Sequence, residues 1–209
     1  MQINEIFYSI QGEGVHIGIP MVFVRFTGCN LRCEWCDTQY AFFEGKKMSL
    51  EDVRKEIKKY KVKWVCITGG EPLLQEEVYP LIYSLLKEEY RILIQTNGSI
   101  PLLDIPCEDT IFINMDIKTP SSKMQDRLLE SNIELLGKKD SIKFVILDDD
   151  DYNFTKQFLK EHQTEGEIII QPEGNKNYKV LVEKVLKDRL NVRVLPQLHK
   201  LIWGDQHGI

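Results

Sequence analysis

Apolar and polar residues follow two different spacings along the chain, and segments with one spacing alternate with segments that have the other. Some segments are short apolar runs rich in β-branched residues, such as RILIQT at residues 91–96, and these are typical of buried strands. Others, such as residues 50–60, carry apolar residues at helical spacing after a capping box formed by Ser49 and Asp52. The predicted strands are residues 2–8, 20–27, 64–68, 91–96, 110–115, 141–147, 167–171 and 192–195. The predicted helices are residues 50–60, a stripe from Leu81 to Leu86 that Pro80 begins or kinks, and about residues 122–136, 150–162 and 176–189.

This order of elements predicts an α/β fold. Strands that alternate with helices form a parallel sheet covered by helices. A complete eight-unit barrel typically takes about 250 residues, and this chain has 209. We therefore expect an incomplete, laterally open (β/α) barrel with about six parallel strands, in a single domain of residues 1–209. Functional groups in such folds lie at the carboxyl ends of the strands.

Three cysteines fall within eight consecutive residues: Cys29, Cys33 and Cys36. Iron–sulfur clusters are usually held by four thiolates, and structural zinc is held by four Cys or His ligands. Three adjacent thiols therefore indicate a metal centre with one open position. The alternatives are a zinc site completed by a distant His or Cys, and three unrelated thiols. The two other cysteines, Cys66 and Cys107, are interpreted as small buried hydrophobes.

Further motifs follow the predicted strands at their carboxyl ends. They are Gly69-Gly70-Glu71-Pro72, Gln95-Thr96-Asn97-Gly98 and Asp116-Ile117-Lys118. An acidic run, Asp148 to Asp151, opens a predicted helix, where negative charge is favoured by the helix dipole. A metal site is the alternative interpretation of that run.

Composition excludes several classes of protein. The 43% apolar and 28% charged content is that of an ordinary globular protein. No apolar run approaches the ~20 residues that span a bilayer, and the first residues do not resemble a secretory signal. A formal charge of -5 provides no general attraction to nucleic acid. We expect a cytoplasmic protein with no membrane contact and no direct nucleic-acid partner.

The Cys-x3-Cys-x2-Cys spacing, with an aromatic residue before the last Cys, resembles the signature of radical S-adenosylmethionine (SAM) enzymes. The flanking motifs narrow the resemblance to the 7-carboxy-7-deazaguanine synthase family of queuosine and 7-deazapurine biosynthesis, and it extends over nearly the whole chain. These motifs are Ser9-Ile10-Gln11-Gly12-Glu13-Gly14, Phe23 to Leu31, Cys36-Asp37-Thr38 and Gln197-Leu198-His199-Lys200. The resemblance implies that Cys29, Cys33 and Cys36 hold a 4Fe-4S cluster whose fourth iron binds SAM.

The resemblance also implies which residues contact SAM. Trp35 would stack beside the adenine, while glycines let the backbone approach the methionyl end and the Glu71 carboxylate pairs with the ammonium. The implied SAM-binding residues are Trp35, Cys36, Asp37, Gly70, Glu71, Asp116, Ile117 and Lys118.

The family's substrate is 6-carboxy-5,6,7,8-tetrahydropterin. Arg25 would hold its carboxylate with two hydrogen bonds, and Thr38 would ligate Mg²⁺ together with the substrate. The terminal carboxylate of Ile209 enters the pocket in short family members, although residues 203–209 match no motif firmly. The implied substrate-binding residues are Ile10, Gln11, Gly12, Glu13, Arg25, Thr68, His199 and Ile209. No side chain is assigned as catalytic, because SAM and the cluster perform the chemistry.

The implied reaction is a radical ring contraction to 7-carboxy-7-deazaguanine with loss of ammonia, in which SAM is regenerated. Its implied partners are an electron donor such as flavodoxin or ferredoxin and a second copy in a homodimer. Two alternatives remain open. One is a radical SAM activase of a glycyl-radical enzyme, which would need neither the magnesium ligand nor the carboxylate clamp. The other is a non-catalytic electron carrier or zinc module in which Cys66 completes the site.

Overall fold

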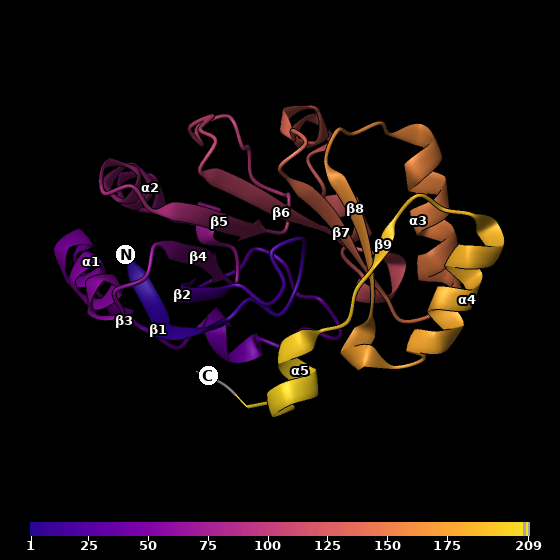
Figure 1. Cartoon of the computed structure of the whole chain (residues 1–209), viewed down its shortest axis with the longest axis horizontal. Helices are drawn as coiled ribbons and strands as arrows, with labels where there is room; N and C mark the ends of the chain where they lie inside the picture. Colours follow the sequence, from indigo (N-terminus) through magenta and orange to yellow (C-terminus); the bar gives the residue numbers. More distant parts are fainter. Residues whose placement is uncertain (207, 209) are drawn as a thin grey trace.

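The computed structural model describes residues 1–206 and 208. Within this part of the chain, nine strands form one sheet in the order β3-β1-β2-β4-β5-β6-β7-β8-β9, which curves into an arch and does not close (Figure 1). The strands are β1 (Gln2–Ile10), β2 (Pro20–Phe26), β3 (Lys46–Lys47), β4 (Trp64–Gly69), β5 (Arg91–Thr96), β6 (Ile111–Ile117), β7 (Ser141–Ile146), β8 (Glu167–Pro172) and β9 (Arg193–Val194). The expected laterally open barrel is confirmed.

Most of the sheet is parallel. Each strand from β2 through β9 pairs in parallel with the next in the sheet, whereas β1 and β3 add an antiparallel edge beside β2. Of the α-helices in the described residues, α1 to α4 cover the convex face, and the short helix α5 lies at the open side of the arch (Figure 1). The helices are α1 (Leu50–Lys59), α2 (Val78–Lys87), α3 (Asp149–Glu161), α4 (Tyr178–Asp188) and α5 (Leu198–Trp203). No helix among the described residues is both long and apolar enough to cross a membrane.

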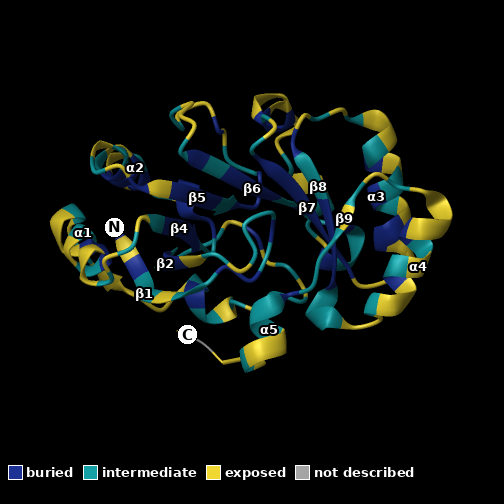
Figure 2. Ribbon diagram, in the orientation of Figure 1, coloured by how far each residue is buried: buried dark blue, intermediate teal, exposed yellow. Residues whose placement is uncertain are grey.

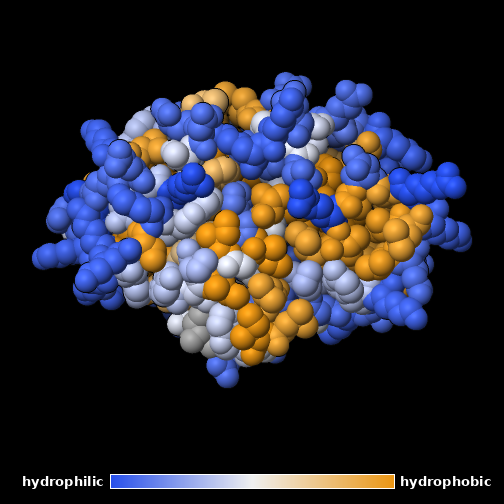
Figure 3. Space-filling view, viewed as in Figure 1, coloured by the Kyte–Doolittle hydropathy of each residue, from blue (hydrophilic) through white to orange (hydrophobic). Residues whose placement is uncertain are grey.

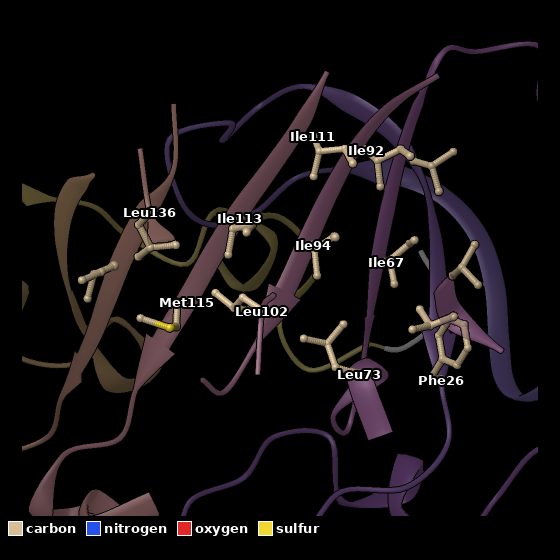
Figure 4. Close-up of a cluster of buried hydrophobic side chains, with 14 of the residues drawn as sticks. Phe26, Ile67, Leu73, Ile92, Ile94, Leu102, Ile111, Ile113, Met115 and Leu136 are labelled. Atoms are coloured by element: carbon tan, nitrogen blue, oxygen red, sulfur yellow. The ribbon is translucent and has the colours of Figure 1, made fainter. Parts of the chain in front are cut away.

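Alternate residues of each strand face opposite sides of the sheet. On β5, Ile92 and Ile94 belong to the main core between the sheet and the helices (Figure 4). Leu93 belongs to a smaller apolar cluster on the concave side. Figure 2 shows the buried strands enclosed by helices whose outer surfaces are exposed. The concave face changes along the strands. Its apolar cluster lies toward their amino ends, and polar side chains follow at their carboxyl ends.

Local sequence explains where two of the helices begin. The capping box of α1 is confirmed, because Ser49 Oγ accepts from the Asp52 N–H while the Asp52 carboxylate accepts from the Ser49 N–H. Helix α2 begins at Val78, so Pro80 lies in its first turn, where a missing N–H is tolerated.

The helix predicted at residues 122–136 is wrong. The segment contains three short 3-10 turns at Pro120–Ser122, Gln125–Arg127 and Glu130–Leu135. Lys123 adopts a left-handed conformation with φ of 61°, which stops helical propagation. The Asn132 side chain is buried and bonds to the backbone of residues 98, 100 and 102. Such side-chain bonds to the backbone of another segment compete with helix formation.

Candidate active site

A cavity of about 610 Å³ opens on the concave face at the carboxyl ends of the strands. Its wall includes the cysteine loop, the polar inward-facing ends of β4, β5, β6 and β7, and the segment that leads into α5. Every predicted SAM or substrate residue among the described residues lines this cavity except Glu71 and Ile117. Ile209 lies outside the described residues. The structure therefore brings together motifs that are almost 190 residues apart in the sequence.

The cysteine loop follows β2. Gly28 begins it with φ of +97° and donates its N–H to Ala41 O at 2.8 Å. Cys29, Cys33 and Cys36 are free thiols that line the cavity. Burial raises the pKa of Cys33 to about 11 and also raises that of Cys29, so these thiols hold their protons until a metal displaces them.

The geometry fits a cluster better than a single ion. Among the described residues, no three His, Cys, Asp or Glu side chains converge to hold one metal ion. In a 4Fe-4S cluster each thiolate binds a different iron, so the sulfurs need not converge on one point. Cys66 is outside the cavity wall, buried on β4 with Gln11 Nε2 3.7 Å from its sulfur. The zinc site completed by Cys66 is therefore wrong. Cys66 is a buried hydrophobe as predicted, whereas Cys107 is exposed.

Two glycines at the end of β4 let the chain pass close under the cysteine loop. A Cβ on Gly70 would lie 2.2 Å from Gly28 O and 2.7 Å from Cys29 Cβ, which no side chain could tolerate. This contact carries two backbone hydrogen bonds, Gly70 N–H to Phe26 O and Glu71 N–H to Gly28 O. The motif thus fixes the position of the first cluster cysteine.

The Glu71 carboxylate does not reach the cavity, in contrast to the expected pairing with the SAM ammonium. It is fully buried and accepts hydrogen bonds from Leu73 N–H, Thr96 Oγ1 and Asn97 N–H. Burial raises the pKa of Glu71 to about 7 despite these donors. Its role here is to join the end of β4 to the end of β5. Ile117 is similarly displaced from its expected role, because its side chain belongs to the main core.

A chain of four alternating charges crosses the cavity wall from the first loop to β6. Lys143 Nζ lies 2.5 Å from Glu13 Oε2 and 3.1 Å from Asp116 Oδ2, and Lys118 Nζ lies 3.2 Å from the same Asp116 oxygen. Burial raises the pKa of Glu13, but the charges of Lys143 and His199 outweigh it and hold that pKa well below its usual range. Burial lowers the pKa of Lys143, but Asp116 and Glu13 raise it overall. Glu13 and Lys143 are therefore ionised near neutral pH.

Glu13 is also held by two amides. Gln171 Nε2 and Gln197 Nε2 donate to its Oε1 at 3.0 and 2.9 Å. Two buried acceptors beside this network, Gln171 Oε1 and Asp116 Oδ1, have no hydrogen-bond partner in the described part of the chain. Buried acceptors are normally satisfied. Asp116 lines the cavity, so a donor on a bound ligand fits its Oδ1.

Arg25 enters the cavity from β2 with an acidic partner that the sequence did not reveal. Its Nε donates to Glu5 Oε1 at 2.7 Å, and the same oxygen accepts from Tyr40 OH at 3.0 Å. The guanidinium carbon lies 5.8 Å from the ring centroids of both Phe7 and Tyr40. The group is thus fixed in orientation, as a bidentate anion clamp requires.

The C-terminal segment closes against the first loop. Leu198 N–H donates to Gly12 O, and a Cβ on Gly12 would lie only 2.1 Å from His199 Nδ1. Glycine at position 12 therefore allows His199 to enter the cavity wall. Thr68 and Gln11 line the same end, where Thr68 Oγ1 donates to Gln95.

Sequence reasoning missed Lys143, Gln171 and Glu5. A signal existed for the first two, since each is a polar residue within an otherwise apolar strand that alternation turns to the concave face. Glu5 carries no such signal, because β1 has intermediate burial over most of its length.

The comparisons with known proteins agree with this geometry. Residues 23–139 match the Radical SAM superfamily. The chain is 42% identical to the 7-carboxy-7-deazaguanine synthase of Thermoplasma acidophilum over all of both chains. The chain belongs to the 7-carboxy-7-deazaguanine synthase family. The family's enzyme from Koribacter versatilis is 40% identical, with 99% of this chain and 98% of the relative covered.

Solved structures share this fold. The crystal structure of QueE from Escherichia coli superposes with a TM-score of 0.77 at 25% identity, covering 95% of this chain and 94% of that one. Streptococcus suis SuiB bound to S-adenosylmethionine has a TM-score of 0.59 at 14% identity, over 83% of this chain and 51% of that chain, and it shares the fold. As a radical SAM family, the 7-carboxy-7-deazaguanine synthases use a 4Fe-4S cluster and SAM, and the three cavity cysteines fit the cluster.

Proposed function

We propose that this chain converts 6-carboxy-5,6,7,8-tetrahydropterin to 7-carboxy-7-deazaguanine and ammonia, a carbon–nitrogen lyase reaction of queuosine and 7-deazapurine biosynthesis. The observation that carries the proposal is that a single cavity has two chemically different ends. The cysteine loop forms one end, and the Arg25 cation with the Glu13 acceptor forms the other. The relatives' shared name supports this substrate.

The residues supply binding and orientation. Cys29, Cys33 and Cys36 would hold the cluster, and the cluster with SAM supplies the radical chemistry when bound. Arg25 holds the substrate carboxylate. Glu13, ionised and fixed by three donors, keeps acceptor capacity for the N–H edge of the pterin, since a carboxylate accepts about four hydrogen bonds.

Magnesium is part of the same proposal. The Thr38 hydroxyl lines the cavity 3.6 Å from Cys36 Sγ and caps no helix, even though Thr38 precedes a 3-10 turn. Mg²⁺ keeps several waters and takes few protein ligands. One hydroxyl combined with a substrate carboxylate therefore fits this ion.

The proposal also covers the oligomeric state, the electron donor and the cellular location. Figure 3 shows two apolar areas on one face, over α5 and over α4 with β9. Leu186 on α4 and Leu201 on α5 are 70% and 61% exposed, which favours burial in a homodimer. We further propose a single radical SAM core domain, a flavodoxin or ferredoxin as electron donor, and a cytoplasmic location, where free thiols persist.

The test is turnover by the anaerobically reconstituted protein with SAM, a reductant, Mg²⁺ and 6-carboxy-5,6,7,8-tetrahydropterin. We expect 7-carboxy-7-deazaguanine by mass spectrometry, in excess over the SAM consumed. SAM cleavage without any change in the pterin would contradict the proposal and favour the activase, whose substrate is another protein.

A further inference from the structure

The acidic run at the start of α3 contains one residue that differs from the others. Asp148, Asp149 and Asp150 are exposed, as charges at a helix terminus usually are, whereas Asp151 is fully buried. Its carboxylate accepts hydrogen bonds from Ser121 N–H at 2.9 Å, Ser121 Oγ at 2.6 Å and Leu147 N–H at 2.8 Å. A buried carboxylate is costly unless it is paired or hydrogen-bonded in this way. A favourable interaction with the helix dipole does not require such burial.

The hydrogen-bond chain continues from Ser121 into the cysteine loop. Trp35 Nε1 donates to Ser121 Oγ at 2.9 Å. The direction of each bond is fixed, because an indole N–H only donates and a hydroxyl has one proton to give. The Ser121 hydroxyl must therefore give its proton to Asp151 and accept from Trp35. Nearby, Glu34 N–H donates to Ser122 O at 3.1 Å, so the same turn holds the loop at two points.

Trp35 is in a position where this restraint matters. It lies between Cys33 and Cys36 in a loop without regular secondary structure, and its side chain lines the cavity. A SAM molecule bound to a cluster on these cysteines must occupy the adjacent cavity. An aromatic ring there offers stacking area only when its orientation is fixed. Lys118 Nζ, 5.7 Å from the ring centroid, is a second neighbour of the ring.

We infer that Ser121 and Asp151 are positioning residues for Trp35, which hold the indole in the cavity wall and thereby set the affinity for SAM. The Trp35–Ser121 bond spans 86 residues of sequence, and the Ser121–Asp151 bond spans 30. Two distant turns thus support the cofactor side of the cysteine loop. The inference uses the SAM site of the proposed function and not its pterin substrate.

A double-mutant cycle on SAM binding tests the inference. The dissociation constant is measured by equilibrium dialysis on anaerobically reconstituted protein of matched iron content, without reductant. Ser121→Ala should weaken SAM binding up to about tenfold, which corresponds to the loss of one neutral hydrogen bond. In a Trp35→Phe background, Ser121→Ala should have no further effect, because the indole N–H it serves is gone. Ser121→Thr keeps the hydroxyl and should restore the wild-type constant.

The matched control is Asp148→Ala. Asp148 accepts from Asp151 N–H as the α3 N-cap but makes no bond to Ser121, so its loss should lower thermal stability and leave SAM affinity unchanged. An equal effect of Ser121→Ala with Trp35 and with Phe, or no effect with Trp35, would overturn the inference. If Ser121→Ala does not fold, Asp151→Asn with and without Trp35→Phe gives the same cycle. Pterin turnover by the wild type is measured separately. If the pterin is not turned over, the effect of Ser121 on SAM affinity can still be determined.

Discussion

The two ends of the cavity are held in place by different kinds of contact. At the cysteine end, backbone hydrogen bonds such as Gly28 N–H to Ala41 O and Gly70 N–H to Phe26 O hold the loop, and the Trp35–Ser121 side-chain bond adds to them. At the opposite end, side chains hold side chains. Glu13 is fixed by Lys143, Gln171 and Gln197, which lie 130, 158 and 184 residues further along the chain.

This difference has a functional consequence. The hydrogen bonds that hold the cysteine loop involve neither Glu13 nor its partners, so a substitution among those partners leaves these bonds in place. The Glu13 end depends on a few charges in a poorly solvated environment, where each charge has a large effect on its neighbours. One substitution there should alter substrate recognition without disturbing the cofactor end.

The strongest test of the cysteine end is removal of its thiols. Cys29→Ala, Cys33→Ala or Cys36→Ala should abolish cluster assembly, because three thiolates leave no spare ligand. Cys66→Ala and Cys107→Ala are matched controls, one buried and one exposed, and should assemble the cluster. Iron content and visible absorbance after anaerobic reconstitution measure the outcome. Loss of the cluster in Cys66→Ala would contradict the three-cysteine assignment.

Lys143→Met tests the opposite end. Removing the ammonium leaves the Glu13 and Asp116 carboxylates without their shared cation, and breaking a buried ion pair in this way costs about 3–5 kcal/mol. We expect kcat/KM for the carboxypterin to fall by roughly a hundredfold or more. The dissociation constant of SAM should change much less. Lys179→Met on α4, whose side chain is 88% exposed, should behave as wild type. An equal loss of kcat/KM and of SAM affinity would contradict the distinction between the two ends.

The same variant should change the pH dependence of activity. In the wild type, Lys143 on β7 and His199 on α5 hold the pKa of Glu13 below its ordinary value of 4.5, against the effect of burial. Glu13 therefore stays ionised above that pH and adds no acidic limb. In Lys143→Met the effect of burial prevails, so the pKa rises and kcat/KM should fall as pH is lowered from 7 toward 5. Asp116 on β6 faces the same ammonium, with its Oδ2 3.1 Å from Lys143 Nζ. Identical pH profiles would show that Lys143 does not control Glu13.

The two ends also differ in how far the sequence predicts them. The cysteine loop and the glycine motif are each one continuous segment at the carboxyl end of a strand, β2 or β4. Strand order alone therefore predicts that the two segments meet. Lys143 meets Glu13 only after β7 has taken its place in the sheet. Its position within Ile142-Lys143-Phe144 shows that it faces away from the main core, but not which residue it meets.

Two errors have the same origin. The sequence motif predicts Glu71 in the cavity, yet its carboxylate accepts hydrogen bonds from Thr96 Oγ1 and Asn97 N–H instead. Residues 122–136 carry apolar spacing compatible with a helix, but Asn132 bonds the backbone of the loop after β5. In both cases a side chain forms hydrogen bonds with backbone groups far away in the sequence, which the local spacing of apolar residues does not predict.

Arg25→Lys tests how strictly the substrate end needs geometry as well as charge. A guanidinium can hold a carboxylate by two parallel hydrogen bonds, while an ammonium is a point charge on a flexible stem. We expect kcat/KM to fall about ten- to a hundredfold, equivalent to one charge-assisted bond of ~1.5–3 kcal/mol. Reductive SAM cleavage without substrate should persist near the wild-type level. Normal turnover by Arg25→Lys would contradict the assignment of Arg25 as the carboxylate clamp. Glu5→Gln keeps an acceptor oxygen for Arg25 Nε and removes only the negative charge, so it should give a smaller defect.

The smallest effect is expected at Thr38, which lies where the two ends meet. Its hydroxyl is near Cys36, yet its proposed ligand is a Mg²⁺ ion shared with the substrate. Because Mg²⁺ keeps most of its water shell, losing one neutral ligand should lower turnover only about tenfold or less in Thr38→Ala. The variant should require more Mg²⁺ for half-maximal rate and should bind SAM normally. Thr38→Ser, which keeps the hydroxyl, is the matched control. A wild-type rate that is independent of Mg²⁺ after thorough chelation would contradict this role, and weakened SAM binding in Thr38→Ala alone would assign the residue to the cysteine end.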